Sequence, residues 1–291
     1  MNFLNILYAV LVLGALGLVF GAVLAVAGKV FAVEKDERYD SILENLPGAN
    51  CGGCGYAGCA SYAEAILAGN AEINCCPASS DEARESISKI MGVELKKNER
   101  LTALVRCNGG TRSKKKFEYL GLKDCVAASK VAGGPLECQY GCLGMGTCVS
   151  ACAFNAIAIN ENGVAEVNGD LCTGCLKCVS ACPRNIIVPV PYTADVNVVC
   201  ASHEKGAILR KICDIGCLGC KICVKTCKSD AIHVEDNLAV IDYSKCTGCG
   251  ECAEKCPRHL IVNSNLMEVC EEESAHVEAE PVAAAESSEN Q

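Results

Sequence analysis

The N-terminal segment is the most uniformly apolar part of the chain. Residues 1–28 carry no charged side chain, and almost every position from Leu4 to Gly28 is apolar. Because an α-helix rises about 1.5 Å per residue, this segment can cross the roughly 30 Å of a bilayer's hydrocarbon core. We predict a transmembrane anchor over residues 1–29. Gly17 and Gly21 form a G-x-x-x-G pattern that would let another helix pack closely.

A secretory signal peptide is the alternative for an apolar N-terminus. Such a peptide begins with a basic region, and nothing basic precedes Lys29. Lys29, Lys35 and Arg38 all follow the apolar segment, and positive charge marks the cytoplasmic side of a membrane helix. We therefore expect a single-pass protein of the cell membrane, with the bulk of the chain on the cytoplasmic face.

Beyond the anchor, apolar positions occur in short runs separated by glycine and polar residues. The runs predict a buried strand at residues 101–105 and two hairpins, at residues 156–167 and 232–241. Helices are expected at residues 60–68 and 86–91. Elements this short and mixed predict an α+β fold made of several small units.

The C-terminal residues 265–291 are expected to form a disordered acidic tail. From Glu271 onward the chain has seven Glu and no Lys or Arg, and these residues supply most of the formal net charge of -9. Low hydrophobicity and like charge disfavour a packed core. The acidic balance and the few aromatic residues also argue against a nucleic-acid partner.

Cysteine content decides what the small units contain. The chain of 291 residues has 26 cysteines, no Trp and only 4% aromatic residues, so its cores must be small. Small cores of this kind are often stabilised by bound metal. The cysteines also repeat: a shift of 75 positions places Cys142, Cys148 and Cys152 on Cys217, Cys223 and Cys227. A shift of 74 superimposes the cysteine runs that begin at Cys172 and Cys246.

Each repeat ends in the run C-x2-C-x2-C-x3-C-P, at residues 172–183 and 246–257. This is the bacterial ferredoxin spacing, in which three nearby thiolates hold one [4Fe-4S] cluster and the fourth ligates its neighbour. We therefore predict two clusters in each repeat. In the second repeat the expected ligand sets are Cys217, Cys220, Cys223 and Cys256 for one cluster, and Cys227, Cys246, Cys249 and Cys252 for the other.

The first repeat departs from the plain ferredoxin run at one position. Met145 stands where the second repeat has Cys220, and a thioether replaces a thiolate ligand poorly. Cys138, four residues before Cys142, is the expected replacement. The predicted ligand sets are then Cys138, Cys142, Cys148 and Cys182 for one cluster, and Cys152, Cys172, Cys175 and Cys178 for the other.

A different cysteine pattern follows the anchor. Cys51, Cys54 and Cys59 are embedded in a glycine-rich loop that can fold tightly around a cluster. The chain returns at Cys75 and Cys76, and we expect Cys76 to be the fourth ligand because Pro77 follows it, as in the C-P ends of the ferredoxin runs. Cys75 is the alternative ligand.

Two other kinds of cysteine site fit the spacing less well. Zinc sites use two well-separated ligand pairs, whereas these runs crowd three or four cysteines together. A disulfide framework suits a small secreted protein, and neither the length nor the N-terminus fits one. The sequence therefore predicts five [4Fe-4S] clusters. Four further cysteines are expected to be buried, reduced packing residues, with an additional cluster as the alternative: Cys107, Cys125, Cys200 and Cys213.

The ordered combination of these motifs resembles a known family. A membrane anchor, the segment from Cys51 to Cys59 and then ferredoxin-like repeats are similar to the B subunit of the Rnf electron-transport complex. The resemblance covers residues 1–262 and implies a membrane complex that couples electron transfer between ferredoxin and NAD to Na+ or H+ translocation. It implies soluble ferredoxin as electron donor and the other Rnf subunits as partners. Shorter members of the family carry one ferredoxin unit, whereas this chain carries two.

The expected organisation has six parts: an anchor (residues 1–29), a single-cluster domain (30–80), a connecting segment (81–124), two ferredoxin-like units (125–192 and 198–264) and the tail (265–291). The connecting segment contains a basic patch, Arg112, Lys114, Lys115 and Lys116, which is either a solvated loop or a docking site for an acidic ferredoxin.

The chain shows no dinucleotide or phosphate fingerprint and no constellation for bond-making chemistry, so we expect an electron carrier without an active site of its own. Two alternatives share its residues. One is a membrane-tethered subunit of a hydrogenase or dehydrogenase without ion pumping. The other is a reductase that resets a redox-sensing regulator.

Overall fold

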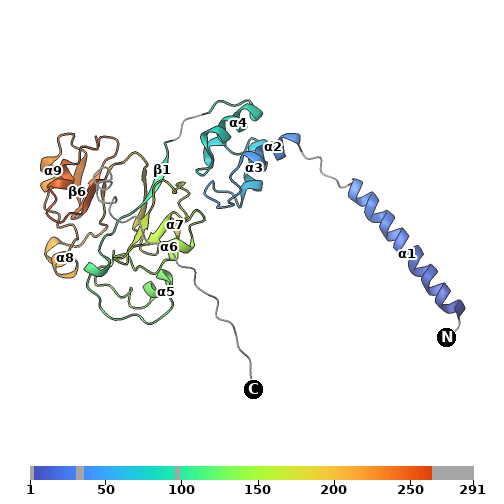
Figure 1. Cartoon of the computed structure of the whole chain (residues 1–291), viewed down its shortest axis with the longest axis horizontal. Helices are drawn as coiled ribbons and strands as arrows, with labels where there is room; N and C mark the ends of the chain where they lie inside the picture. The colour runs from blue at the N-terminus through green and yellow to red at the C-terminus, as the bar shows by residue number, and fades with distance from the viewer. Residues whose placement is uncertain (1–2, 31–35, 96–98, 264–291) are drawn as a thin grey trace, which may run out of the picture.

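The computed structural model describes residues 3–30, 36–95 and 99–263. The predicted acidic tail and Cys270 lie outside these ranges. The predicted N-terminal helix is present as α1 (Phe3–Val30), which Figure 1 shows apart from the other elements. Its window from Leu11 to Gly28 is apolar, long enough to cross a membrane and not buried against the rest of the chain.

Residues 36–93 form a small helical unit with its own core. α2 (Glu37–Asn45), α3 (Cys59–Leu67), the short η1 (Ile73–Cys75) and α4 (Asp81–Met91) surround fully buried side chains of Ile42, Tyr62, Ile66 and Ile87. The Ser80 side chain accepts from the Ala83 amide and caps α4, which ends at the left-handed Gly92. The predicted helix at residues 60–68 is confirmed, and the one at 86–91 is the second half of α4.

Four two-stranded antiparallel sheets build the rest of the chain. The predicted hairpins are confirmed as β2–β3 and β6–β7, and two further pairs, β1–β4 and β5–β8, join strands far apart in sequence. The strand bounds are β1 (Leu101–Val105), β2 (Ile157–Ile159), β3 (Ala165–Val167), β4 (Ile187–Pro191), β5 (Val196–Val198), β6 (Ile232–Glu235), β7 (Leu238–Ile241) and β8 (Ile261–Asn263).

The two sheets of each repeat have the same order. In the second repeat β5 and β8 enclose the β6–β7 hairpin, and in the first repeat β1 and β4 enclose the β2–β3 hairpin. β1 therefore belongs structurally to the first repeat, outside the range 125–192 that the sequence predicted for it. The segment between β1 and residue 138 carries η2 (Gly110–Arg112) and α5 (Cys125–Lys130), which the second repeat replaces with α8 (Gly206–Ile212) alone.

Very short helices follow the cysteine loops of both repeats. They are α6 (Thr147–Ser150), α7 (Lys177–Ala181), α9 (Ile222–Thr226) and α10 (Glu251–Glu254), and each has a buried cysteine. Each repeat has a separate core in which these cysteines pack with strand residues such as Ile157 and Ile232. Helices and strands this short bury little apolar surface, as the low aromatic content predicted.

Candidate metal centres

The N-terminal cysteines lie in a loop that glycines allow to fold tightly. The Asn50 side-chain oxygen accepts from the Cys59 amide at 2.9 Å, at the start of α3. A Cβ at Gly58 would lie 2.7 Å from that oxygen, so this contact requires glycine. Gly52 has a φ of 69°, a left-handed conformation that other residues rarely adopt. Cys54 and Cys59 both pack against the core of the helical unit, and Cys51 lies near Cys76 of that core.

Cys76 and Cys75 point in different directions. Cys76 is buried in the core of the helical unit with Cys54 and Cys59, whereas Cys75 is exposed. The buried Tyr62 hydroxyl fixes the segment before these cysteines by donating to the carbonyls of Glu72 and Ile73 at 2.7 and 2.8 Å. Burial raises the pKa of Cys76, and the nearby Cys54 and Cys51 raise it further. The geometry thus favours Cys76 as the fourth ligand.

The second repeat places its eight predicted cysteines in two groups. A small cavity is lined by Cys217, Cys220, Cys223 and Cys256. In the other group, burial raises the pKa of Cys252 to about 11, and the neighbouring Cys246, Cys227 and Cys249 raise it further. The structure therefore brings together the cysteines of each expected set, and their role as cluster ligands stays a prediction.

One group of the first repeat also matches its predicted set. Burial raises the pKa of Cys178 to about 11, with contributions from the nearby Cys172, Cys175 and Cys152. The Ala156 amide donates to the Cys152 sulfur at 3.4 Å, and the equivalent Ala231 amide donates to Cys227 at 3.3 Å. Amide hydrogen bonds of this kind tune the reduction potential of a cluster.

The other group of the first repeat differs from the expected one. A small cavity is lined by Cys125, Cys142, Cys148 and Cys182, without Cys138. Burial raises the pKa of Cys148 to about 12, and Cys142, Cys125 and Cys182 add to the effect. The structure thus places Cys125, at the start of α5, and not Cys138 beside Cys142, Cys148 and Cys182.

Cys138 lies instead in a separate cavity with Cys107, Cys200 and Cys213. The expectation for Cys138 rested on its closeness to Cys142 along the chain. The positions of the strands argue against that expectation. Cys107 follows β1 by two residues, as Cys200 follows β5. The first repeat therefore has extra residues between Cys107 and Cys138, compared with the segment between Cys200 and Cys213 in the second repeat. Cys125 lies among these extra residues. A shift of 75 positions places it on Cys200, but the two are not structurally equivalent, because Cys125 begins α5 and Cys200 follows β5.

Single metal ions and [4Fe-4S] clusters need different spacings of their cysteine sulfurs. Among the described residues, no three side chains of His, Cys, Asp or Glu converge on one metal-ion position, and the described cysteines are free of disulfides. A [4Fe-4S] cube carries one thiolate on each of four iron atoms, so its sulfurs stand farther apart than those around one zinc ion. Burial raises the pKa of the Cys148, Cys178 and Cys252 thiols, so iron must displace protons when it binds to them.

The N-terminal unit contacts one cysteine group of the first repeat. A Cβ at Gly53 would lie 2.9 Å from the Cys175 Cβ and 3.1 Å from the Cys175 carbonyl oxygen. A Cβ at Gly52 would lie 3.3 Å from the Lys177 ammonium nitrogen. The two cysteine loops therefore meet backbone to backbone, which brings the N-terminal group beside the group of Cys152, Cys172, Cys175 and Cys178.

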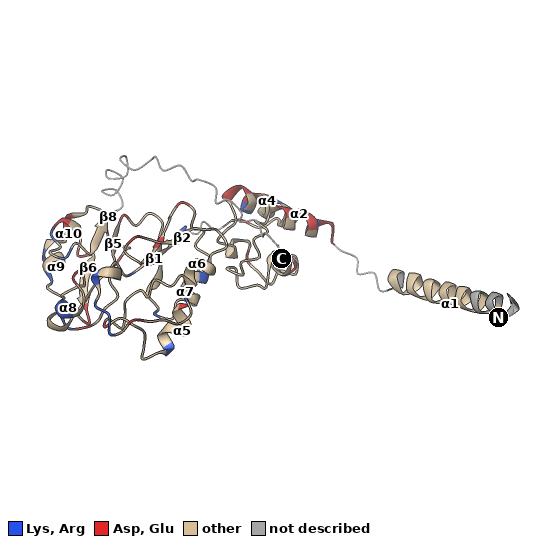
Figure 2. Ribbon diagram, turned by 60° about the horizontal axis from the view of Figure 1, so that its bottom comes forward, with Lys and Arg blue, Asp and Glu red and all other residues tan. Residues whose placement is uncertain are grey.

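Charge is unevenly distributed over these units. Figure 2 shows acidic residues on the ribbon of α2 and α4, two helices of the N-terminal unit. Lys114, Lys115 and Lys116 of the predicted basic patch are exposed, whereas the Arg112 guanidinium donates to the carbonyl and side-chain oxygens of Asn108 at 2.7 and 2.8 Å. Ferredoxin docking at this patch stays a prediction.

Two family models match the cysteine-rich parts of the chain. The model of the FeS domain, an Fe-S cluster module, matches residues 46–78. The model of the 4Fe-4S binding domain matches residues 165–188 and 239–262. The matched residues contain the loops that hold the cysteine groups described above.

Named relatives cover most of the chain. The B subunit of the Na+-translocating ferredoxin:NAD+ oxidoreductase complex of Acetobacterium woodii is 45% identical over 88% of this chain and 77% of its own length. The B subunit of the proton-translocating complex of Clostridium ljungdahlii is 43% identical over 93% of this chain and 98% of its own. The B subunit of the ion-translocating oxidoreductase complex of Methanosarcina acetivorans is 41% identical over 87% and 96%. The chain therefore belongs to the family of B subunits of ion-translocating (Rnf-type) oxidoreductase complexes.

Proposed function

We propose that this chain is the electron-transfer subunit of a membrane-bound ferredoxin:NAD+ oxidoreductase that couples electron flow to Na+ or H+ translocation. Single electrons would enter from reduced ferredoxin and leave toward other subunits of the complex. The observation that carries the proposal is the close similarity to B subunits of such complexes over 87 to 93% of the chain. The same similarity favours this function over the hydrogenase, dehydrogenase and regulator alternatives.

The electrons would pass through five [4Fe-4S] clusters. We assign one to the N-terminal loop and two to each ferredoxin-like repeat, with Cys125 in place of Cys138. The proposed ligand sets are Cys51, Cys54, Cys59 and Cys76; Cys125, Cys142, Cys148 and Cys182; Cys152, Cys172, Cys175 and Cys178; Cys217, Cys220, Cys223 and Cys256; and Cys227, Cys246, Cys249 and Cys252.

The chain's own residues have a limited set of tasks in this reaction. The cysteines bind iron, which supplies the one-electron chemistry when the clusters are present. Backbone amides, such as those of Ala156 and Ala231, donate to cysteine sulfurs and stabilise the more negative, reduced state. The chemistry at NAD+ and the movement of ions would belong to other subunits.

The N-terminal helix α1 would anchor this electron-transfer subunit in the membrane. α1 has the length and composition of a membrane span, and the basic residues that follow it favour a cytoplasmic location for the bulk of the chain.

Deletion of this subunit tests the function. Membranes that lack it are expected to lose NAD+ reduction by reduced ferredoxin, because electrons have no route into the complex. Restoring the wild-type chain should restore the activity, and so should the Cys75→Ala variant, since Cys75 is exposed and outside every proposed ligand set. Full ferredoxin-dependent NAD+ reduction in membranes without the subunit would rule the proposal out.

A further inference from the structure

The first repeat carries an extra loop that the second repeat lacks. Many more residues separate Cys107 from Cys138 than separate Cys200 from Cys213. The additional residues follow η2 and include α5. Figure 1 shows α5 and the loop that leads to it at the lower edge of the first repeat. A long loop at the edge of a small unit is a common place for a binding surface.

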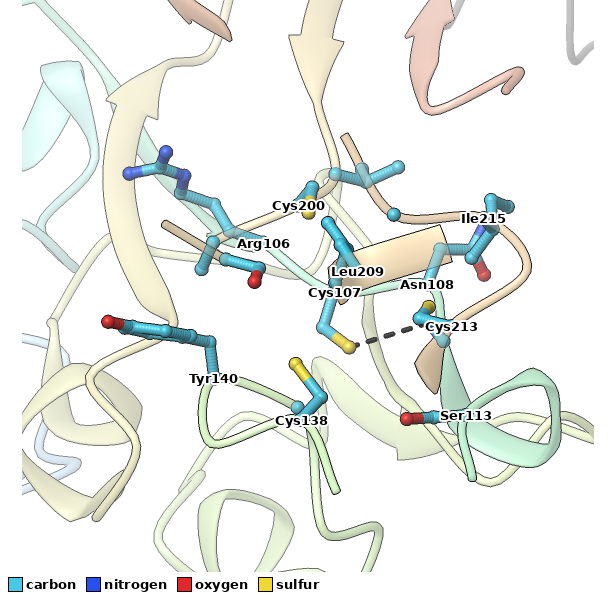
Figure 3. A pocket seen from close by; sticks show the side chains of 16 residues that line it. Arg106, Cys107, Asn108, Ser113, Cys138, Tyr140, Cys200, Leu209, Cys213 and Ile215 are labelled. Carbon is cyan, nitrogen blue, oxygen red and sulfur yellow. Dashed lines mark hydrogen bonds between the residues drawn. The ribbon is translucent and has the colours of Figure 1, made fainter. Parts of the chain in front are cut away.

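Both ends of this loop are held by the rest of the repeat. At one end Ser113 lines the cavity shown in Figure 3, and the Lys116 amide donates to the Pro135 carbonyl at 2.7 Å. At the other end the Thr147 hydroxyl donates to the Asp124 carboxylate at 2.9 Å. The residues between Lys116 and Asp124 therefore project from a fixed base.

Two leucines of the projecting part are almost fully exposed. Leu120 is 88% exposed and Leu122 is 76% exposed, compared with 78% for Leu18, the most exposed large apolar residue described in α1. Val126 in α5 and Val131 just after it are exposed as well. Single exposed apolar residues are common, but four so close together in the chain form a patch that indicates a contact surface.

Positive charge accompanies these apolar side chains. Five exposed lysines occur in residues 114–131, and Figure 2 shows one of them in blue on α5: Lys114, Lys115, Lys116, Lys123 and Lys130. The segment has only two acidic residues, Glu118 and Asp124. It is therefore locally basic in a chain whose formal net charge is -9. We call the five lysines and the four exposed apolar residues the basic-apolar patch.

Exposed leucines among lysines are typical of a surface that binds anionic lipid. The lysines are attracted by negative headgroups, and the leucines enter the boundary between headgroups and acyl chains. We propose that the basic-apolar patch docks on the anionic lipid surface of the membrane in which α1 is anchored, and so holds the first repeat against the bilayer. The proposal rests on the anchor and the electron-transfer function proposed above.

The anchor keeps the patch close to such a surface. α1 ends at Val30 and α2 begins at Glu37, and at about 3.6 Å per residue this connection spans at most about 25 Å. The N-terminal unit, which begins with α2, contacts the first repeat where Gly53 meets Cys175. Tethering raises the effective concentration of the lipid surface, so a weak attraction is enough for docking.

An acidic ferredoxin is the other occupant that positive charge would suit. Encounters between soluble electron carriers are small and are guided mainly by charge, because the partners must separate after each transfer. Such an encounter accounts for the lysines and leaves the exposure of Leu120 and Leu122 unexplained. A lipid surface uses both kinds of side chain.

The patch would orient the chain without replacing its anchor. One loop with a few apolar side chains binds lipid weakly and reversibly, so α1 remains necessary for a stable membrane location. Cys125 is the first residue of α5 and a proposed cluster ligand. Docking would therefore hold the cysteine group of Cys125 near the bilayer in a fixed orientation.

Lysine footprinting of the full-length chain tests the docking. The chain is inserted into vesicles of phosphatidylcholine, or of equal parts phosphatidylcholine and phosphatidylglycerol, and its lysines are acylated by a membrane-impermeant ester and located by mass spectrometry. Lys116 and Lys123 are expected to react several-fold more slowly on the anionic vesicles. In about 1 M salt, where the screening length falls to about 3 Å, this protection should largely disappear. Lys221 and Lys225, exposed lysines of the second repeat, are the control and should react equally on both kinds of vesicle.

Variants separate the apolar contribution from the charge. Leu120→Ser combined with Leu122→Ser should reduce the protection several-fold and keep the iron content, because both side chains are exposed. Leu171→Ser, at an exposed leucine outside the patch, is the matched control and should keep the protection. Lys114→Gln and Lys115→Gln should each lower the ratio of docked to free loops about fivefold.

Three results would overturn the proposal. They are equal acylation of Lys116 and Lys123 on neutral and anionic vesicles, full protection in the double leucine variant, and protection that appears only after ferredoxin is added, which would assign the patch to a protein partner. The wild-type comparison decides even where a variant fails to fold. The footprint needs no electron donor and no other subunit, so its failure differs from failure of the proposed function, which the assay of NAD+ reduction reports.

Discussion

At the residue scale, neighbouring cysteines differ in what they can bind because the fold aims them differently. Cys75 and Cys76 are adjacent, yet one is exposed and the other is 4% exposed. The difference arises from η1, which turns the chain just before Cys76, and from Tyr62, which holds that turn by its hydroxyl. Pro77 suggested Cys76 as the candidate, and burial gives the physical reason to prefer it.

This arrangement predicts opposite outcomes for two neighbouring substitutions. Cys76→Ala is expected to remove the N-terminal cluster and about four iron atoms, because no other buried thiolate lies opposite Cys51 and Cys54 among the described residues. Cys75→Ala should keep all of the iron. Iron analysis and EPR of the two variants provide the check, and equal iron content in both would contradict the ligand assignment.

At the element scale, the cysteine loops are placed by the short strands and helices around them. The β1–β4 and β5–β8 pairs close each repeat, and the loops that carry the cysteines lie between these strands. The backbone contact between Gly53 and Cys175 then brings the N-terminal loop against the first repeat. The N-terminal cysteine group therefore lies beside the group that contains Cys175.

Gly53→Ala tests the contact between the loops. The added methyl would meet Cys175 at 2.9 Å, so the loops must separate, and overpacking of this kind costs about 1–3 kcal/mol. We expect slower electron exchange between the N-terminal cluster and the first repeat, measured by freeze-quench EPR, with the iron content kept.

Gly169→Ala is the matched control for that substitution. Its Cβ would meet only the Tyr192 ring, at an ordinary contact distance of 3.8 Å, and it lies outside the contact between the loops. Electron exchange should therefore stay at the wild-type rate. If Gly53→Ala behaved in the same way, the contact would have no part in electron transfer.

At the scale of the whole molecule, the anchor and the cluster units are separate in structure. The described side chains of α1 from Leu11 to Gly28 pack against nothing else in the described chain, and the cores of the other units contain no residue of α1. An apolar helix with every side exposed is stable in lipid and unfavourable in water.

Removal of residues 1–30 should therefore change location and leave the clusters intact. Expressed without the other subunits, the truncated chain is expected in the soluble fraction with the iron content of the full-length chain. Fractionation followed by iron analysis checks both points. A truncated chain that still sediments with membranes would show that another surface binds lipid.

Much of this architecture follows from local sequence. The membrane helix, the β1 strand, both hairpins and the helix after Cys59 formed where the patterns predicted them. Hydrophobic periodicity and turn residues act over a few positions, so they can be recognised along the chain. The β1–β4 and β5–β8 pairs were missed, because their partners lie far apart in sequence and are joined by tertiary contacts.

The sequence by itself determined an apolar N-terminal helix, a glycine-rich cysteine loop and two 4Fe-4S binding domains, because hydrophobic pattern and motif spacing reflect contacts within short segments. Only the tertiary structure decided which distant cysteines meet. Cys125 joins Cys142, and Cys138 joins Cys107, Cys200 and Cys213, because β1 pairs with β4 and residues 112–116 bridge the two repeats. Proximity along the chain could not reveal either group, since long-range backbone pairing sets both.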